Sequence, residues 1–100
     1  MHHHHCFFWL KDDLSKSELI EFEKGLNTLV NDPLVISGFF GKPADTHRGV
    51  VENSYSYGLS LKFKDLIDHN QYQADSIHQE FVDQNSYKWS RVQVFDIETE

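Results

Sequence analysis

Residues 4–10 have the sequence HHCFFWL, in which large apolar side chains occupy consecutive positions. A short apolar run rich in aromatic residues is typical of a β-strand. Side chains point alternately to the two faces of a strand, so Phe8 and Leu10 share one face, whereas Phe7 and Trp9 share the other. A strand with one face in water would instead alternate apolar and polar residues. The stretch therefore predicts a sheet that is apolar on both faces.

A helix is predicted directly after this strand. Ser15 is suited to the N-cap, and Glu18 stands at the spacing of a reciprocal capping box. Apolar residues then recur along one helical stripe, at Leu19, Phe22, Leu26, Leu29 and Val30. Pro33 ends the pattern, because proline disrupts a helix interior. The helix is thus expected to place one apolar face on the sheet.

Two further strands follow, at residues 35–41 and 55–63, joined by a polar loop at 41–53. The later strand alternates clearly. One predicted face carries Tyr55, Tyr57, Leu59, Leu61 and Phe63. The other carries the small or polar residues Ser54, Ser56, Gly58, Ser60 and Lys62. Small residues on this second face would suit a close approach between two sheets.

The remaining segments are a short helix at 65–72, a second helix with Ser76 as N-cap and Gln79 as capping-box partner, and a last strand at 89–97. The order is that of the α+β, ferredoxin-like βαββαβ fold. This fold is a four-stranded antiparallel sheet with the helices on one face. At this length we expect a single domain over residues 1–100.

A sheet of this kind leaves one apolar face uncovered. Three large aromatic side chains on that face would expose roughly 450–750 Å², more than the few hundred Å² usual for a monomer. Their burial would contribute at most about 11–19 kcal/mol per chain, against about 4–15 kcal/mol lost per association. We therefore expect a homodimer, a barrel of two sheets with Phe7 and Trp9 at the interface. The alternative is that the 41–53 loop covers these two side chains.

Charge and cysteine content narrow the function classes. The chain has 9 Lys and Arg against 16 Asp and Glu, a net charge of −7, which would repel nucleic acid. No secretory leader or membrane-spanning apolar run is visible, and the only cysteine, Cys6, cannot form an internal disulfide. We expect a cytoplasmic protein without nucleic-acid or membrane partners, and Cys6 as a small core residue.

The run His2–His5 has two interpretations, a purification tag or the start of a native strand, and both stay open here. His2 and His4, or His3 and His5, share a strand face and could chelate zinc or nickel. We expect such binding to be adventitious, and predict neither a physiological metal site nor a cofactor.

Four segments together resemble the stress-responsive A/B barrel domain (Dabb) family of the dimeric α/β barrel superfamily. They are residues 4–11 (HHCFFWLK), 48–55 (RGVVENSY), 72–81 (YQADSIHQEF) and 91–96 (RVQVFD). The resemblance covers essentially the whole chain. It implies a ferredoxin-like protomer and a homodimeric α/β barrel. It implies little about activity, because most bacterial members have no assigned function.

One plant branch of the family contains a polyketide cyclase, with a pocket between helices and sheet. The matching positions here are His4, Tyr57, Tyr72 and His78. The cyclase pattern has histidine where this chain has Tyr57, and the proline typical before the last helix's histidine is absent. Both departures weaken a transfer of the reaction.

Within this implied pocket, His78 and Tyr72 are the candidate catalytic residues, and His4, Tyr57 and Phe81 the candidate lining residues. A neutral imidazole can accept a proton from carbon next to a carbonyl, and a phenol can hold the carbonyl oxygen. The alternative for His78 is a semi-buried histidine bonded to backbone or to Tyr72. The alternative for the tyrosines is an aromatic core.

Arg48, with His47, could bind an anion above the pocket mouth; the alternative is a solvated or interface loop.

Two functions follow. The preferred one is a homodimeric module, stress-linked or binding a small apolar ligand. The alternative is a cofactor-free lyase, cyclase or isomerase that uses His78 and Tyr72 for proton transfer on a hydrophobic carbonyl compound.

Overall fold

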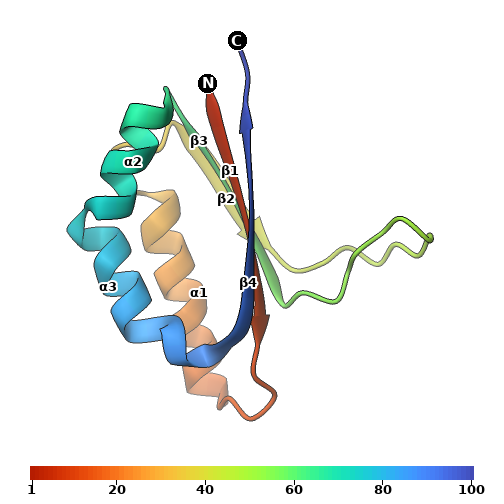
Figure 1. Ribbon diagram of the computed structural model, residues 1–100. Coiled ribbons are helices and arrows are strands. Elements are labelled where there is room, and N and C mark those ends of the chain that lie inside the picture. The colour runs from red at the N-terminus through yellow and green to blue at the C-terminus, as the bar shows by residue number, and fades with distance from the viewer.

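The computed structural model describes residues 1–100 and consists of a helix layer on a sheet, with the two termini side by side (Figure 1). The elements are β1 (His2–Leu10), α1 (Lys16–Val30), β2 (Ser37–Gly41), β3 (Tyr57–Phe63), α2 (Leu66–Ala74), α3 (Ser76–Asn85), the 3₁₀ turn η1 (Ser86–Lys88) and β4 (Trp89–Glu98). None of the helices has the length and apolar composition needed to cross a membrane.

The strands form one antiparallel sheet in the order β2-β3-β1-β4. All three helices cover the same side of it (Figure 1); we call this side the inner face and the other the open face. The inner face includes His2, His4, Cys6 and Phe8 of β1 and Tyr57, Leu59, Leu61 and Phe63 of β3. The open face includes Phe7 and Trp9 of β1, Phe39 of β2, and Phe95 and Ile97 of β4. The predicted ferredoxin-like α+β fold is confirmed.

Helix α1 begins as its sequence predicts. The Ser15 hydroxyl accepts a hydrogen bond from the backbone N–H of Glu18 at 3.2 Å, and the Glu18 carboxylate accepts one from the Ser15 N–H at 2.9 Å. This reciprocal pair is a capping box. On the predicted stripe, Phe22, Leu26 and Leu29 are fully buried against the inner face. The helix thus supplies the centre of the core.

Helices α2 and α3 start at aspartates. The Asp65 carboxylate accepts a hydrogen bond from the N–H of Asp68, and the Asp75 carboxylate accepts one from that of His78, both at 2.9 Å. The prediction of Ser76 as N-cap was wrong: Asp75 caps the helix, and Ser76 is its first residue. Aspartate is as good an N-cap as serine, so the boundary moved by one position.

Strand β3 begins at Tyr57, two residues later than predicted, and β2 is shortened in the same way. The N–H of Ser56 donates to the Phe8 carbonyl at 2.7 Å, and the chain bends at this residue. The bend breaks the alternation, so Tyr55 does not share the face of Tyr57. Its ring packs on the open face against Phe7, with ring centroids 4.9 Å apart.

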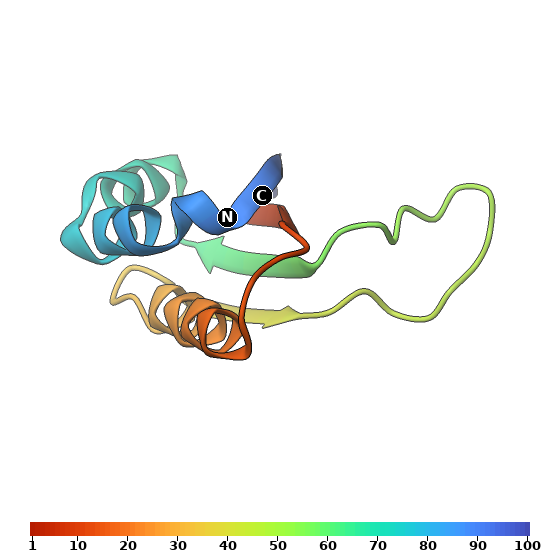
Figure 2. The same cartoon turned by 90° about the horizontal axis from the view of Figure 1, so that it is seen from below.

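Residues 42–56 form a long loop that projects away from the helices, on the open side of the sheet (Figures 1 and 2). Only its last residues reach the aromatic side chains: the Trp9 indole N–H donates to the Ser54 hydroxyl at 3.0 Å. Phe7 and Trp9 stay half-buried. The loop therefore does not cover the open face of its own chain.

Candidate functional site

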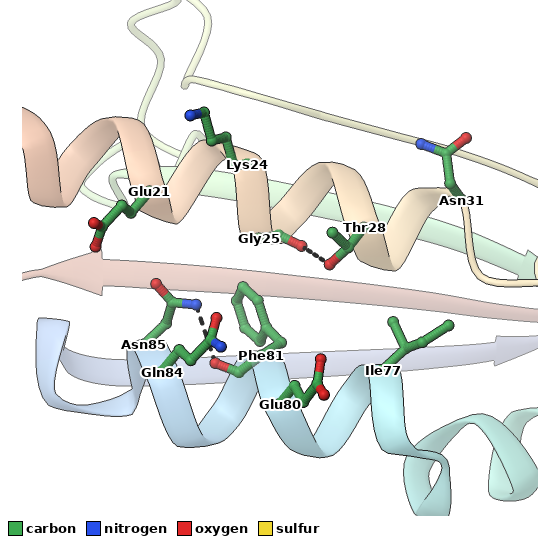
Figure 3. A pocket seen from close by; sticks show the side chains of 10 residues that line it. All are labelled: Glu21, Lys24, Gly25, Thr28, Asn31, Ile77, Glu80, Phe81, Gln84 and Asn85. Carbon is green, nitrogen blue, oxygen red and sulfur yellow. Dashed lines mark hydrogen bonds between the residues drawn. The ribbon is translucent and has the colours of Figure 1, made fainter.

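The helix layer has an open groove between α1 and α3, of about 810 Å³ (Figure 3). Its walls carry exposed charged side chains of both signs, among them Glu21, Lys24 and Glu80. Its floor is a tight contact between Gly25 and Phe81. No histidine or tyrosine lines it. The groove lacks the converging titratable groups that a reaction site needs.

A smaller cavity of about 150 Å³ lies between the sheet and helices α2 and α3. Ten of its thirteen lining residues are hydrophobic. The lining residues are His4, Cys6, Phe8, Leu29, Leu59, Tyr72, Gln73, His78, Phe81, Val82, Trp89, Val92 and Val94. An apolar cavity with a few converging polar groups is the usual form of a small-molecule site.

His78 stands in the first turn of α3, held by the hydrogen bond from its backbone N–H to Asp75. Its Nδ1 is buried and has no hydrogen-bond partner. Burial lowers the pKa of His78, although the charge of Asp75 opposes this. The imidazole is therefore neutral at pH 7 and has an unused nitrogen, as a general base requires.

Tyr72 of α2 lies beside His78, with ring centroids 5.0 Å apart. Its side chain is fully buried, and burial raises its pKa. The phenol therefore keeps its proton and can donate a hydrogen bond to a carbonyl oxygen. Together, the two rings present one acceptor and one donor at the same wall of the cavity.

His4 of β1 is the third polar residue at this wall, 6.4 Å from Tyr72 between ring centroids. Its Nδ1 lies 2.7 Å from a carboxylate oxygen of Asp96 on β4. Burial lowers the pKa of His4 more than Asp96 raises it. The nitrogen Nε2 of His69 lies 3.2 Å from the same Nδ1. His4 thus joins the cavity to a second polar cluster.

The sequence reasoning missed His69 and Asp96. His69 precedes Tyr72 by three positions, so both fall on one face of α2. Asp96 is opposite His4 in the β1–β4 pairing. The helical spacing was a usable signal for His69, whereas Asp96 required the strand register.

The predicted site residues separate into two groups. His4, Tyr72, His78 and Phe81 all line the cavity. Tyr57, expected there, does not: its hydroxyl donates instead to the Glu23 carboxylate of α1.

Arg48 also lies elsewhere than predicted. It is an exposed residue of the 42–56 loop, which projects on the opposite side of the sheet from the helices (Figure 1). It therefore cannot cover the mouth of a cavity that lies under the helices. Cys6 is a core residue, as predicted, and burial raises its pKa to about 12, which disfavours the reactive thiolate form.

The open face has a hollow of its own, of about 370 Å³. It is lined by Phe7, Trp9, Glu52, Tyr55, Arg91, Gln93 and Phe95. The Arg91 guanidinium lies 4.2 Å from the centroid of a Trp9 ring, a cation–π contact. Phe39, Phe95 and Ile97 are each more than half exposed. The two predicted interface residues thus lie in an aromatic cluster with Tyr55 and Phe95.

Solved structures with this fold come from plants and bacteria. A protein of Arabidopsis thaliana is 23% identical, with 100% of this chain and 96% of that chain covered and a TM-score of 0.81. A hydroxynitrile lyase of Passiflora edulis is 16% identical, with 99% and 93% covered and a TM-score of 0.81. A dimeric ferredoxin-like protein of unknown function from Thermobifida fusca is 13% identical, with 98% and 90% covered and a TM-score of 0.78. These likenesses show the fold alone.

A comparison with curated proteins finds no match. The family comparison is decisive instead, because one family model, described as the stress responsive A/B barrel domain, matches residues 3–99. The chain therefore belongs to the stress responsive A/B barrel domain (Dabb) family.

Proposed function

We propose that this protein is a homodimer that binds a small, mostly apolar carbonyl compound in the cavity between sheet and helices. The cavity itself supports this proposal most strongly: its lining is hydrophobic except at His4, Gln73 and His78. An apolar ligand body would bury its surface there. Its carbonyl oxygen would accept a hydrogen bond from the Tyr72 hydroxyl.

The size of the cavity limits the ligand. An apolar cavity of about 150 Å³ is large enough for benzene, and this cavity is of that size. We therefore expect a ligand with a single ring or a short branched chain. A multi-ring product would require the helices to move.

Self-association is supported by the open face. Phe39, Phe95 and Ile97 are 68%, 55% and 52% exposed, beside half-buried Phe7 and Trp9. Exposed apolar side chains gathered on one face mark an interaction surface. The 42–56 loop also projects on this side (Figures 1 and 2). Two copies packed sheet to sheet would cover both patches with one two-fold contact.

Light scattering coupled to gel filtration tests the dimer. The wild type is expected at twice the mass of the chain, and Phe95→Glu at the mass of one chain, because a carboxylate would be buried in the interface. Ile67→Glu is the matched control: Ile67 is 76% exposed, on α2, and the variant should stay dimeric. A wild type that is monomeric at micromolar concentration would contradict the proposal.

Ligand binding is tested with acetophenone against ethylbenzene, which has the same shape without the carbonyl. Chemical-shift changes in the amide spectrum should map to the cavity and be stronger for acetophenone. Val94→Trp should block binding, because Val94 lines the cavity from β4. Val50→Trp, in the exposed loop, is the control. Equal binding by wild type and Val94→Trp would place the ligand elsewhere.

A second candidate function is proton transfer on the bound compound. The buried, unpaired Nδ1 of His78 favours it. In this mechanism Nδ1 takes the proton from the carbon next to the carbonyl, the electron pair moves to the carbonyl oxygen, and the Tyr72 hydroxyl stabilises the resulting enolate. Return of the proton to the opposite face of that carbon, or to a conjugated carbon, completes an isomerisation. Departure of a leaving group from the neighbouring carbon, with its bonding electrons, as the carbonyl re-forms instead makes a lyase. No cofactor is required.

Exchange of the acetophenone methyl protons in D₂O, followed by NMR, tests this step. Wild-type protein should accelerate exchange over buffer, His78→Ala should abolish the acceleration, and Tyr72→Phe should reduce it. Retained binding without acceleration in the wild type would leave a binding protein and refute the enzyme. The hydroxynitrile lyase of the same fold shows that this fold accommodates a lyase; the proposal here depends on the residues.

We also place the protein in the cytoplasm and in a stress-linked role. The one cysteine, Cys6, is a free, buried thiol, which suits a reducing compartment. Fractionation of cells, and transcript levels under heat or oxidative stress, would test the two assignments.

A further inference from the structure

Four potential metal ligands converge at one end of the sheet, outside the wall formed by His78 and Tyr72. His2 and His4 come from the start of β1, Asp96 from the end of β4, and His69 from α2. Figure 1 shows why they meet: α2 lies beside the end of the sheet where the chain begins and ends. The three histidines are buried, and only the aspartate faces solvent.

The ligand atoms lie near the spacing of a tetrahedral site. His4 Nδ1 is 2.7 Å from Asp96 Oδ1 and 3.2 Å from His69 Nε2, and His2 Nε2 is 3.2 Å from Asp96 Oδ1. All four atoms lie within 4.8 Å of one another. Bonds of about 2.0–2.1 Å around zinc imply tetrahedral edges of about 3.3 Å. Small side-chain adjustments would bring all four atoms to a common centre.

We propose that His4, His69 and Asp96, with His2 as fourth ligand, bind a divalent transition-metal ion of the zinc class. Three imidazoles and one carboxylate are the donor types that zinc takes, whereas magnesium and calcium prefer oxygen ligands. The site goes beyond the proposed function and does not depend on it, although His4 belongs to both.

The protonation states suit a metal. Burial lowers the pKa of His69 to about 4, and the neighbouring histidines contribute. Burial also lowers the pKa of His4. For Asp96, burial opposes ionisation, but the hydrogen bond and charge of His4 keep its pKa below the ordinary value. Neutral imidazoles and an ionised carboxylate are the metal-binding forms, and a net charge of −7 favours a cation.

Without a metal, the same atoms form a hydrogen-bond network. His4 and His2 then each donate to Asp96, and His69 Nε2 accepts from the Gln73 amide at 3.2 Å. In this arrangement the Nδ1 of His69 is buried without a partner. The network and the metal site are thus distinguishable by direct metal binding.

Titration of chelator-treated protein with Zn²⁺, in competition with a chromophoric chelator, is the test. One Zn²⁺ per chain is expected. His69→Ala, and separately Asp96→Asn, should weaken binding roughly 100-fold or more, since even outer-shell changes cost about 10–100-fold. The asparagine variant keeps the shape of the side chain, so it covers the case in which His69→Ala fails to fold. Co²⁺ in place of Zn²⁺ should give the visible absorption of four-coordinate cobalt.

The double variant His3→Ala/His5→Ala is the control that tests whether the histidine run alone chelates the metal. These two side chains lie on the open face, so this double variant should keep the stoichiometry and affinity. If it loses the metal, or if His69→Ala and Asp96→Asn bind as tightly as the wild type, the run alone chelates the ion and the proposal is overturned.

Discussion

The two faces of the sheet differ, although β1 supplies large side chains to both. On the inner face, Phe8 is buried by three aromatic rings, of Phe22, Phe81 and Trp89, at 5.3–6.0 Å. On the open face, neighbouring Phe7 meets only Tyr55 and Phe95 at its edge and stays half-buried. One face completes its packing within the chain, and the other does not. The same strand therefore supplies the core and the proposed interface.

The two faces of the sheet also differ in the chemical groups that they carry. Three titratable side chains whose pKa values burial lowers, His4, His69 and His78, lie on the helix side of the sheet. Burial removes water from them and shifts their pKa values. The open face instead has an exposed aromatic patch with one guanidinium over Trp9. We therefore expect substitutions on the inner face to change stability and ligand binding, and those on the open face to change assembly.

Substitution of the two neighbouring phenylalanines should give the largest contrast. Phe8→Ala should lower the free energy of unfolding by about 3–5 kcal/mol, because a fully buried ring is lost and a cavity is left. Phe7→Ala should lower it less, and by an amount that depends on protein concentration, because the ring belongs to the proposed interface. Urea denaturation at two protein concentrations, tenfold apart, measures both.

This prediction would be contradicted if Phe7→Ala lowered the free energy of unfolding as much as Phe8→Ala and the loss did not depend on protein concentration. The open face would then be part of the core of a single chain. Ser60→Ala on the open face of β3 is a useful reference, since it removes little volume and one hydrogen bond to His5 and should change stability by about 1 kcal/mol or less.

Local patterns in the sequence predict most of the fold. The capping box of Ser15 and Glu18 and the apolar stripe of α1 depend on neighbours in the chain, so they could be identified directly. The start of β3 could not, because the bend at Ser56 depends on a hydrogen bond to Phe8, 48 positions away. Tyr55 was therefore assigned to the wrong face.

In the candidate site, too, local patterns in the sequence predict some residues and not others. His78 and Phe81 are three positions apart on α3, so helical spacing brings these two to one wall, whereas Tyr72 comes from the preceding helix α2. Tyr57 was misplaced because its hydroxyl has a partner in Glu23, a contact between elements that no spacing reveals. Asp96 was missed because its role depends on strand register. The positions of Tyr57 and Asp96 therefore depend on tertiary contacts rather than on local propensity.

The pH dependence of stability should come from the inner face. His69 has a pKa of about 4 in the folded protein, below its ordinary 6.5, so the unfolded chain takes up the proton first as pH falls. Folded stability is then full above pH 6.5 and is lost between 6.5 and 4, by about 1–2 kcal/mol for this group at pH 5. His4 and His78, whose pKa values are also lowered, act in the same direction.

Asp32 opposes this loss. Burial raises its pKa to about 6, so its ionised form destabilises the fold above that pH, and the cost disappears on acidification. Denaturation at pH 7 and pH 5, with a chelator present, should show a smaller acid loss for His69→Gln than for the wild type. An unchanged loss would assign the pH dependence to groups other than His69.

The smallest predicted effect concerns two glycines. A Cβ at Gly25 of α1 would lie 2.9 Å from a ring carbon of Phe81 and 3.0 Å from the Asn85 amide, at the contact between α1 and α3 (Figure 3). Overpacking of this kind costs about 1–3 kcal/mol, whereas alanine gains about 1 kcal/mol over glycine in a helix. Gly25→Ala should therefore be destabilised by about 1 kcal/mol in thermal unfolding. Gly41, on the open face of β2, has nothing within 4 Å of its Cβ position, so Gly41→Ala should be neutral. Because Phe81 also lines the cavity, a ring displaced by Gly25→Ala would reduce acetophenone binding as well. A Gly25→Ala variant with the stability and the acetophenone binding of the wild type would instead show that the helices adjust without disturbing the site.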